Sequence, residues 1–487
     1  MPGELGVHAD TVRAREQLLA TRARASTEVD RVLIPTLRDA YRSVRRGRRR
    51  LDTIGAEILS AVADPEIPWL DTPAGARQLQ TFLTAKARDI RGVIADAVAD
   101  SRARVALLDP LSTGYPPGTD PREVSRWWSS LTPAQRDRLI TEHQELGNRN
   151  GIPTDVRDEI NRQVLTDDIS RVDNATEAVS AADMVRYRNA LEVRAGLSGD
   201  SGRDHIPMFL HTYDPGAFDG RGRAAIAIGN PDTADDTAVV VLGARSSVSD
   251  GRLSRPGGLR IYDEVVRADP GKTNSVVVWL GYRAPDGLAD PQVAQTALAR
   301  AGGVLLAADV DALRVTHDGA SHLTVIGHSY GSTTVADAAT GAGMVADDVV
   351  LVGSPGTDLA RNAGDFHLPD GGHVYVGAAS SDPVTHLAGE PRIPIPGSGV
   401  TVGLGGDPAA DGYGSVRFKA ETPGLTSPSE DHGSYFDPGS ESLFSIGDIA
   451  SGHGDALTHD RMTAAHRHRL PRFDPETIRP GTGGHRH

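Results

Sequence analysis

The stretch Leu323-Thr324-Val325-Ile326-Gly327-His328-Ser329-Tyr330-Gly331-Ser332 joins a short apolar run to a segment of small residues. The apolar run predicts a buried strand, and the small residues after it predict a helix. Between them stands the pattern G-x-S-x-G, which in this strand–turn–helix setting is typical of a serine nucleophile on a sharp turn. Gly327 and Gly331 would let the backbone and helix approach without a clashing Cβ. Ser329 is therefore the candidate nucleophile.

A serine hydroxyl needs a base and an orienting carboxylate, and in such a sheet these follow it in the order acid, then histidine. Asp382 lies just beyond a predicted strand at 373–379, and Asp358, which follows the preceding strand, is the alternative acid. We favour Asp382 because the acid usually lies further along the sheet. His432, on a predicted loop after the last strand, is the candidate base.

Developing negative charge on the substrate oxygen requires backbone donors close to the serine. The N–H of Tyr330, at the start of the predicted helix, is the first candidate donor. The second should come from the loop after a predicted strand at 237–242, where we favour Ala244 and take Gly243 as the next choice.

Near residue 205 the sequence changes from a helical period to short apolar runs separated by turns, which predict strands. Helical segments at 293–306 and 332–342 lie between the later strands. This order predicts an α/β sheet that is antiparallel at its start and parallel afterwards. The predicted strands are Ile206–Thr212, Arg223–Gly229, Thr237–Leu242, Ser275–Leu280, Leu323–Gly327, Asp348–Gly353, His373–Ala379 and Ser415–Ala420.

The chain before this sheet is predicted to be mostly α-helical. Helical periodicity over 30–63 and a restart at Thr72-Pro73 predict a hairpin within residues 1–108. The apolar stripe of the first helix is Leu37, Tyr41, Val44, Leu51, Ile58 and Val62. The further predicted parts are a linker at 109–121, a helical segment at 122–204, the α/β domain at 205–470 and a disordered tail at 471–487.

The helical segment at 122–204 carries apolar side chains that need burial, namely Trp127, Trp128 and Leu131. Two arrangements are open for them. They would either pack against the mouth of the sheet or fill a core within the helical segment alone.

Composition narrows the classes of function. The chain has no cysteine, so disulfides and thiolate sites are excluded. The net charge of −14 argues against a nucleic-acid partner, and Arg45–Arg50 is interpreted as a solvated helix face. The histidines of the tail lack the spacing of a built site, so no metal and no cofactor are expected. No apolar run is long enough to span a membrane.

The N-terminal sequence bears on localisation and on partners. It has no apolar h-region, which predicts a cytoplasmic protein, with export by a signal-independent route as the alternative. The N-terminal helices are a candidate surface for a protein partner or for self-association.

From about Arg122 to Phe436 the chain resembles an actinobacterial α/β-hydrolase family, long catalogued as a domain of unknown function. The resemblance implies the hydrolase fold, with Ser329 as nucleophile, Asp382 as acid and His432 as base. One departure is the loop Leu242-Gly243-Ala244-Arg245, where a Pro-Gly-Thr-like turn is expected. The landmarks are Trp127-Trp128, Leu131, Pro133, Gly147-Asn148, Gly151-Ile152-Pro153, Val156-Arg157, Trp279-Leu280-Gly281-Tyr282, Pro285, Gly327–Gly331 and His432-Gly433-Ser434-Tyr435.

These features predict a serine hydrolase (esterase- or lipase-like) acting on a carboxylic ester, a lipid or a related acyl substrate. An acyltransferase would use the same triad, and a non-catalytic binding or secretion-associated protein could retain the fold. The N-terminal residues also resemble the helical-hairpin proteins of specialised actinobacterial secretion, although Pro68-Trp69-Leu70-Asp71 lacks their W-x-G motif.

Overall fold

The computed structural model describes residues 34–61, 72–108, 118–176, 178–198, 206–254, 257–287, 290–389, 393–394, 401–423, 427–469, 472–481, 483–485 and 487. The chain divides into two compact units, Met1–Tyr115 and Pro116–His487. Most of the predicted linker, residues 109–117, lies outside the described residues. In the described parts of the chain, no helix combines the length and apolar character that crossing a bilayer requires.

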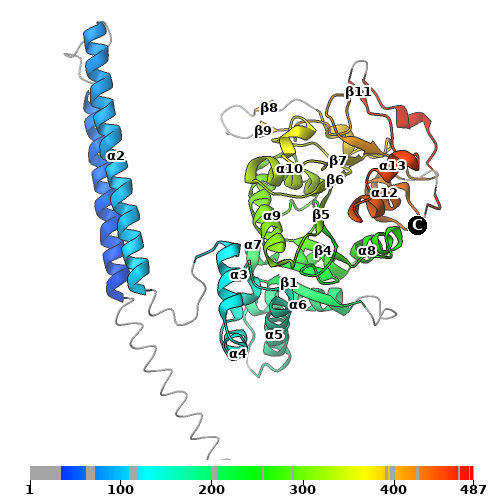
Figure 1. Ribbon diagram of the computed structural model, residues 1–487, viewed down its shortest axis with the longest axis horizontal. Helices are drawn as coiled ribbons and strands as arrows, with labels where there is room; N and C mark the ends of the chain where they lie inside the picture. Colours follow the sequence, from blue (N-terminus) through cyan, green and yellow to red (C-terminus); the bar gives the residue numbers. More distant parts are fainter. Residues whose placement is uncertain are drawn as a thin grey trace, which may run out of the picture. The chain divides into compact units, whose positions relative to one another are not determined.

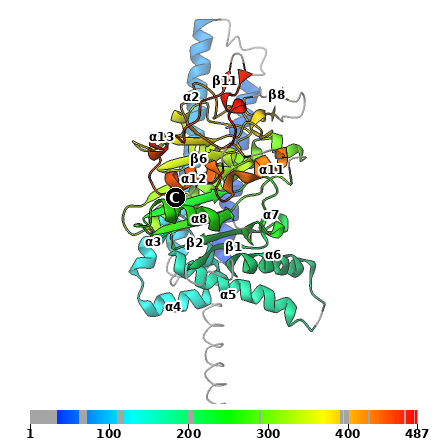
Figure 2. The same cartoon turned by 90° about the vertical axis from the view of Figure 1, so that its right-hand side faces the viewer.

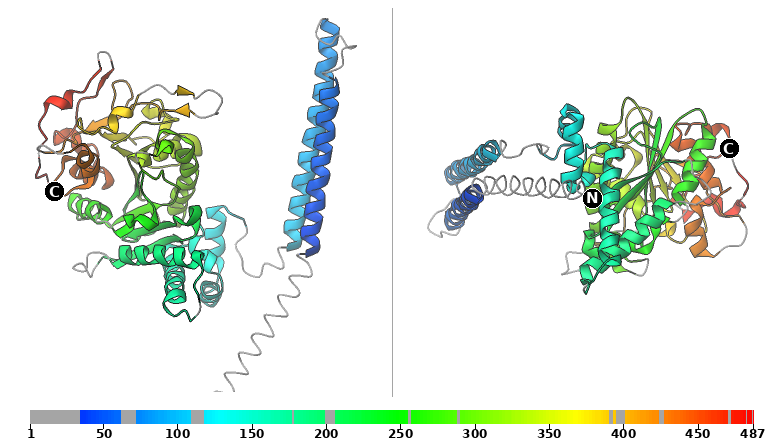
Figure 3. Two further views of the ribbon diagram at one scale, coloured as in Figure 1. Left: turned by 180° about the vertical axis from the view of Figure 1, so that it is seen from behind. Right: turned by 90° about the horizontal axis from the view of Figure 1, so that it is seen from below.

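The N-terminal unit contains two long helices that lie side by side (Figure 3). Residues 34–61 form the first, and α2 (Pro73–Leu108) forms the second. As the sequence predicts, Thr72 caps α2, because its side-chain oxygen accepts a hydrogen bond from the Gly75 N–H at 3.1 Å. The predicted turn between the helices lies outside the described residues.

The second unit is built on one eight-stranded sheet in the order β1-β2-β4-β3-β5-β6-β7-β10. β2 pairs antiparallel with both β1 and β4, and the remaining neighbours pair in parallel. All eight predicted strands are present in this sheet, which confirms the predicted fold class. Their bounds are β1 Met208–Asp214, β2 Arg223–Ile228, β3 Asp236–Val241, β4 Asn274–Leu280, β5 His322–His328, β6 Asp348–Val352, β7 Val374–Gly377 and β10 Val416–Phe418.

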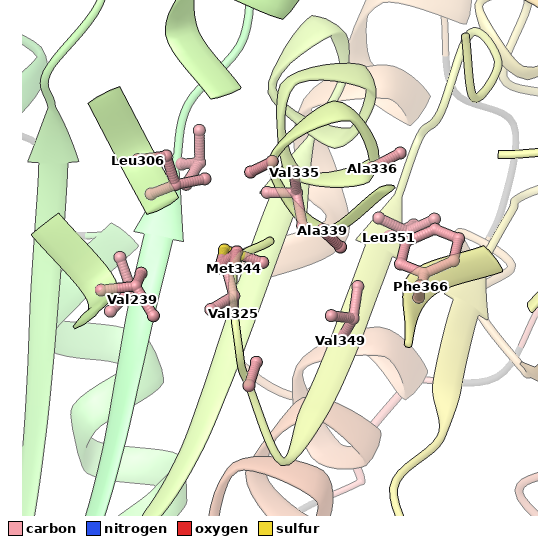
Figure 4. Packing of buried hydrophobic residues seen from close by; sticks show 14 of the residues in the cluster. Val239, Leu306, Val325, Val335, Ala336, Ala339, Met344, Val349, Leu351 and Phe366 are labelled. Atoms are coloured by element: carbon pink, nitrogen blue, oxygen red, sulfur yellow. The ribbon is translucent and has the colours of Figure 1, made fainter. Parts of the chain in front are cut away.

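Helices cover both faces of the sheet (Figure 1). α9 (Ala297–Thr316) and α10 (Tyr330–Ala342) cover one face, and α8 (Gly257–Ala268) and α12 (Glu441–Ala450) cover the other. Alternate side chains of β3 show the two-sided burial, since Val239 belongs to the first core and Val240 to the second. Figure 4 shows Val239, Val325 and Val349 of three neighbouring strands within the first core.

A helical segment precedes the sheet and has a core of its own. Its elements are α3 (Pro121–Ser130), α4 (Pro133–Glu142), η2 (Gln144–Asn148), α5 (Thr154–Asp173) and α6 (Ala181–Ser198). Trp128 packs there with Val124, Leu139, Leu146, Ile152 and Ile160. Trp127 and Leu131 are partly buried against the same cluster. Of the two arrangements that the sequence leaves open, the structure shows the core within the helical segment.

Side chains of η2 and α5 form hydrogen bonds with the backbone of β1, which is an edge strand of the sheet. Helices α5 and α6 both lie beside this strand (Figure 2). The Asn148 amide accepts from the Tyr213 N–H at 2.8 Å and donates to the Tyr213 carbonyl at 2.7 Å. At Leu210, the N–H donates to Asp158 at 2.5 Å and the carbonyl accepts from Asn161 at 3.0 Å. The helical segment thus satisfies backbone groups that would otherwise lack a strand partner.

The prediction of a disordered tail from residue 471 onward is wrong for the residues described. β12 (Arg472–Phe473) pairs with β11 (His468–Arg469), and η9 spans Pro475–Ile478. Arg479 donates to the buried Glu441 at 2.7 and 2.8 Å, and Asp474 accepts from Arg417 at 2.8 and 2.9 Å. These ion pairs between charged side chains attach residues 472–481 to the rest of the second unit.

The remaining elements are short and lie in the connections of the second unit. They are α7 Ala217–Gly220, α11 Pro428–Gly433, α13 Ala456–His459, β8 Ile393–Pro394, β9 Thr401–Val402, η3 Val248–Asp250, η4 Arg252–Ser254, η5 Pro291–Ala294, η6 Ala363–Phe366, η7 Thr385–Leu387 and η8 Ser434–Phe436.

Candidate active site

Ser329 lies on the turn between β5 and α10, in a conformation that L-residues rarely adopt. Its φ is 56° and its ψ is −131°. A Cβ on Gly327 would lie 2.5 Å from the Ser332 Cα, and one on Gly331 would lie 2.3 Å from the Val241 carbonyl oxygen. Both glycines are therefore required by the turn, as the G-x-S-x-G pattern predicts.

The structure brings Ser329, Asp382 and His432 into one hydrogen-bonded chain. The Nε2 atom of His432 lies 2.9 Å from the Ser329 Oγ. The Nδ1 atom lies 2.9 Å from Asp382 Oδ2 and 3.1 Å from Oδ1. The two nitrogens of one imidazole ring thus connect a hydroxyl to a carboxylate in the geometry of a Ser-His-Asp triad.

The position of His432 differs from the predicted loop, because the residue lies on the short helix α11. Ser427 caps that helix, accepting from the Glu430 N–H, and Glu430 reciprocates at the Ser427 N–H. The S-x-x-E capping box at this point of the sequence was the signal for a helix. A capped turn orients the imidazole more firmly than an irregular loop would.

Asp382 is buried and accepts several hydrogen bonds. Besides His432, the Tyr435 hydroxyl donates to Oδ2 at 2.7 Å and the Val384 N–H donates to Oδ1 at 2.9 Å. Burial by itself would raise the pKa of Asp382, but the hydrogen bonds and the neighbouring His432 outweigh it, so the pKa is lowered. The carboxylate therefore stays ionised at neutral pH.

Asp358, the alternative acid, has a different partner. Its carboxylate is buried and accepts from the Arg300 guanidinium at 2.5 and 3.2 Å. The structure thus brings Asp382, and not Asp358, to His432.

The loop after β3 lies directly against the turn that carries Ser329. A Cβ on Gly243 would lie 2.6 Å from the Ser329 Cβ and 2.9 Å from the Tyr330 nitrogen. Tyr282 holds this loop by donating to the Leu242 carbonyl at 2.9 Å. Tyr282, one of the landmark residues, therefore supports the loop that carries the candidate oxyanion donor.

Within that loop, the Arg245 N–H donates to the Pro285 carbonyl at 2.8 Å. Arg245 has a φ of 59°, so the backbone turns sharply just after Ala244. The Ala244 N–H therefore remains the predicted second donor to an oxyanion, with Gly243 as its neighbour.

Three residues of the site were not singled out as contributors from the sequence: His328, Gly353 and Tyr435. A Cβ on Gly353 would lie 2.9 Å from the Tyr435 ring and 3.2 Å from the His432 Cε1. The available signals were the glycine that ends the strand before Asp358 and the tyrosine three positions after His432.

His328 contacts His432 both at its backbone carbonyl and at its ring. Its Nε2 lies 2.9 Å from the His432 carbonyl oxygen, and the two rings lie 4.9 Å apart. Burial, together with the neighbouring His432, lowers the pKa of His328 to about 4. At neutral pH the ring is therefore uncharged and can donate one N–H to that carbonyl.

We expect His328→Phe to lower kcat by up to about a hundredfold, because losing the donor lets the His432 backbone shift away from Ser329. KM should change little, since His328 acts through His432. His328→Gln, which keeps an N–H donor, should restore most of the activity. Steady-state kinetics of both variants test this, with thermal unfolding as a check on folding. Equal losses in both variants would show that the ring itself, and not its hydrogen bond, matters.

Among the described residues, no cluster of three or more His, Cys, Asp or Glu side chains could hold a metal ion.

Two family models match the chain: one described as alpha/beta hydrolase over residues 217–391, and one described as a domain of unknown function, DUF4226, over residues 5–120. The uncharacterized protein Rv2079 of Mycobacterium tuberculosis is 48% identical over 392 residues, which is 72% of this chain and 59% of the relative. The uncharacterized protein Mb0988c of Mycobacterium bovis is 33% identical over 194 residues, 38% of this chain and 68% of the relative. The chain belongs to an actinobacterial family of α/β hydrolases.

The chain spans 59% of the length of Rv2079. Among solved structures, a mutant of the esterase E40 aligns with 13% identity and a TM-score of 0.30, covering 60% of this chain and 97% of that one.

Proposed function

We propose that the protein is a serine hydrolase that cleaves carboxylic esters, including lipid esters, through a covalent acyl-enzyme. One observation carries the proposal: His432 lies at 2.9 Å from both the Ser329 hydroxyl and the Asp382 carboxylate. This arrangement supplies the base that a serine hydroxyl needs in order to act as a nucleophile. The hydrolase family of the chain supports the same class of reaction.

In the first half of the reaction, Ser329 Oγ attacks the ester carbonyl carbon while His432 Nε2 takes the hydroxyl proton. Asp382 keeps the proton of His432 on Nδ1 and stabilises the imidazolium that forms. The tetrahedral intermediate collapses, His432 gives the proton to the departing alkoxide, and the alcohol leaves. Ser329 then carries the acyl group as an ester.

In the second half, His432 takes a proton from water as the water oxygen attacks the acyl carbon. Collapse of the second intermediate returns the proton to Ser329 Oγ and releases the carboxylic acid. In both halves the oxyanion would accept hydrogen bonds from the N–H groups of Tyr330 and Ala244. The proximity of Gly243 to the Tyr330 nitrogen supports this assignment.

A fluorophosphonate probe tests the proposal without knowledge of the substrate. We expect the Ser329 Oγ of the native protein to bond to the phosphorus of the probe and displace fluoride, while His432 takes the hydroxyl proton. Peptide mass spectrometry should then locate one phosphonyl group on the peptide that contains Ser329. Heat-unfolded protein is the control and should not react, because the triad exists only in the fold. A native protein that remains unlabelled, or is labelled mainly elsewhere, would contradict the proposal.

The products decide between water and an alcohol as the acceptor of the acyl group. With a p-nitrophenyl ester, hydrolysis releases p-nitrophenol and free acid in equal amounts. If adding glycerol or ethanol diverts most of the acyl group to a new ester, acyl transfer is the principal reaction.

A further inference from the structure

The first helix of the N-terminal unit, residues 34–61, exposes the N-terminal part of its apolar stripe, from Leu37 to Leu51. Leu37, Tyr41 and Val44 are 58%, 64% and 69% exposed. The two helices instead meet through other positions: Ile54 and Val93 are buried at 8% and 5% exposure. An apolar stripe open to solvent on a long helix is typical of a binding surface.

The same helix concentrates positive charge beside this stripe. Residues 34–50 contain seven arginines and one acidic residue, Asp39, whereas the whole chain carries a net charge of −14. A surface hollow of about 590 Å³ is lined by Leu37, Tyr41 and five of these arginines. The seven, all exposed, are Arg38, Arg42, Arg45, Arg46, Arg48, Arg49 and Arg50.

Most of this charge is not neutralised within the described part of the chain. Arg42 lies 3.5 Å from Asp39, and Arg50 lies 2.7 Å from Asp96 of α2. The other five arginines form no ion pair with a described residue. Arg45 lies over the Tyr41 ring, 5.7 Å from its centroid, so cationic and apolar groups form one continuous surface.

We infer that this face of residues 34–51 binds the surface of an anionic phospholipid membrane. A helix lying in the interface inserts its apolar side chains at the headgroup boundary, while arginines on either side pair with phosphates. Leu37, Tyr41 and Val44 supply the inserted groups, and the long arginine stems can lie along the same boundary. One partner then both neutralises the arginines and buries the apolar side chains.

Other partners satisfy only one of the two features. A second copy of the chain could cover the stripe, but it would bring two sets of seven arginines together, which like-charge repulsion opposes. A nucleic acid would match the charge, but it would leave Leu37 and Val44 exposed and would find a single aromatic side chain, Tyr41, on this face.

Vesicle sedimentation of the full chain tests the inference. We expect binding to vesicles of phosphatidylcholine mixed with phosphatidylglycerol, weaker binding as salt is added, and little binding to pure phosphatidylcholine. Arg45→Gln, Arg46→Gln and Arg49→Gln together should weaken the partition coefficient by about a hundredfold, since each arginine near such a surface contributes about fivefold. Glutamine keeps the helix, which circular dichroism can verify.

A matched control removes three exposed arginines elsewhere, Arg188, Arg194 and Arg361, and changes the net charge equally. This variant should bind the vesicles as the native chain does. A second variant, with Leu37, Tyr41 and Val44 all replaced by glutamine, should lose at least about tenfold in binding while keeping its arginines.

The inference is overturned if the native chain does not bind anionic vesicles, or if the control variant loses as much binding as the arginine variant. It is also overturned if analytical ultracentrifugation shows a dimer that the glutamine replacement of the stripe dissociates. Binding does not depend on the proposed hydrolase activity, so Ser329→Ala protein should sediment with the vesicles like the native chain. The two proposals can therefore fail separately.

Discussion

Ser329→Ala protein is expected to hydrolyse a p-nitrophenyl ester about 10⁶ times more slowly than the native chain. The Ser329 hydroxyl is the atom that would form the covalent intermediate, and alanine leaves His432 with no proton to accept. Ester release followed at saturating substrate measures the change in kcat. Ser249→Ala is the matched control, because Ser249 is an exposed serine in the connection after β3. Activity that survives in Ser329→Ala protein would place the nucleophile elsewhere.

The backbone at Ser329 provides an internal check on that result. A non-glycine residue at φ 56° and ψ −131° costs about 1–3 kcal/mol, and glycine would relieve this strain. Ser329→Gly should therefore be as inactive as Ser329→Ala while unfolding at a higher temperature. Loss of activity together with a gain in stability cannot be attributed to misfolding.

Asp382→Asn is expected to lower kcat by about 10⁴, the second largest effect. An asparagine amide would donate to His432 Nδ1, which would put the imidazole proton on Nε2. In that tautomer the ring cannot accept the proton of Ser329. The same kinetic assay measures this loss, and retention of the native unfolding temperature would exclude a change of fold.

Asp358→Asn is the control for this prediction, because Asp358 is also a buried aspartate but pairs with Arg300. Its replacement should lower the unfolding temperature and leave kcat within a few-fold of the native value. If instead Asp358→Asn abolished activity and Asp382→Asn did not, the acid of the triad would have to be reassigned.

The sheet and the three candidate residues could be predicted because their signals are local. Short apolar runs separated by turns mark the strands, and Ser329, Asp382 and His432 follow strands in a fixed chain order. The order of strands across the sheet and the helices α8 and α12 carry no comparable signal. α12, for example, carries Glu441, Ser445 and Asp448 at helical spacing, as an exposed polar face would, yet all three side chains are buried.

The supporting residues escaped prediction for a different reason. His328 and Tyr435 act on His432 and Asp382 through contacts between segments more than fifty residues apart, and no spacing in the sequence encodes them. In the N-terminal unit the regular apolar stripe predicted a packed interface. In the structure Leu37, Tyr41, Val44 and Leu51 of that stripe are exposed. Periodicity shows which side chains align and not what they contact.

The pairing of Asn148, Asp158 and Asn161 with β1 has a consequence for how these molecules behave towards one another. An edge strand with free N–H and carbonyl groups is a template on which a strand from another molecule can add, and sheets joined in this way grow into aggregates. Here side-chain amides and a carboxylate occupy the places that such a strand would take. The helical segment thus prevents edge-to-edge association at β1. It caps this edge of the sheet with side chains, and no further strand is needed there.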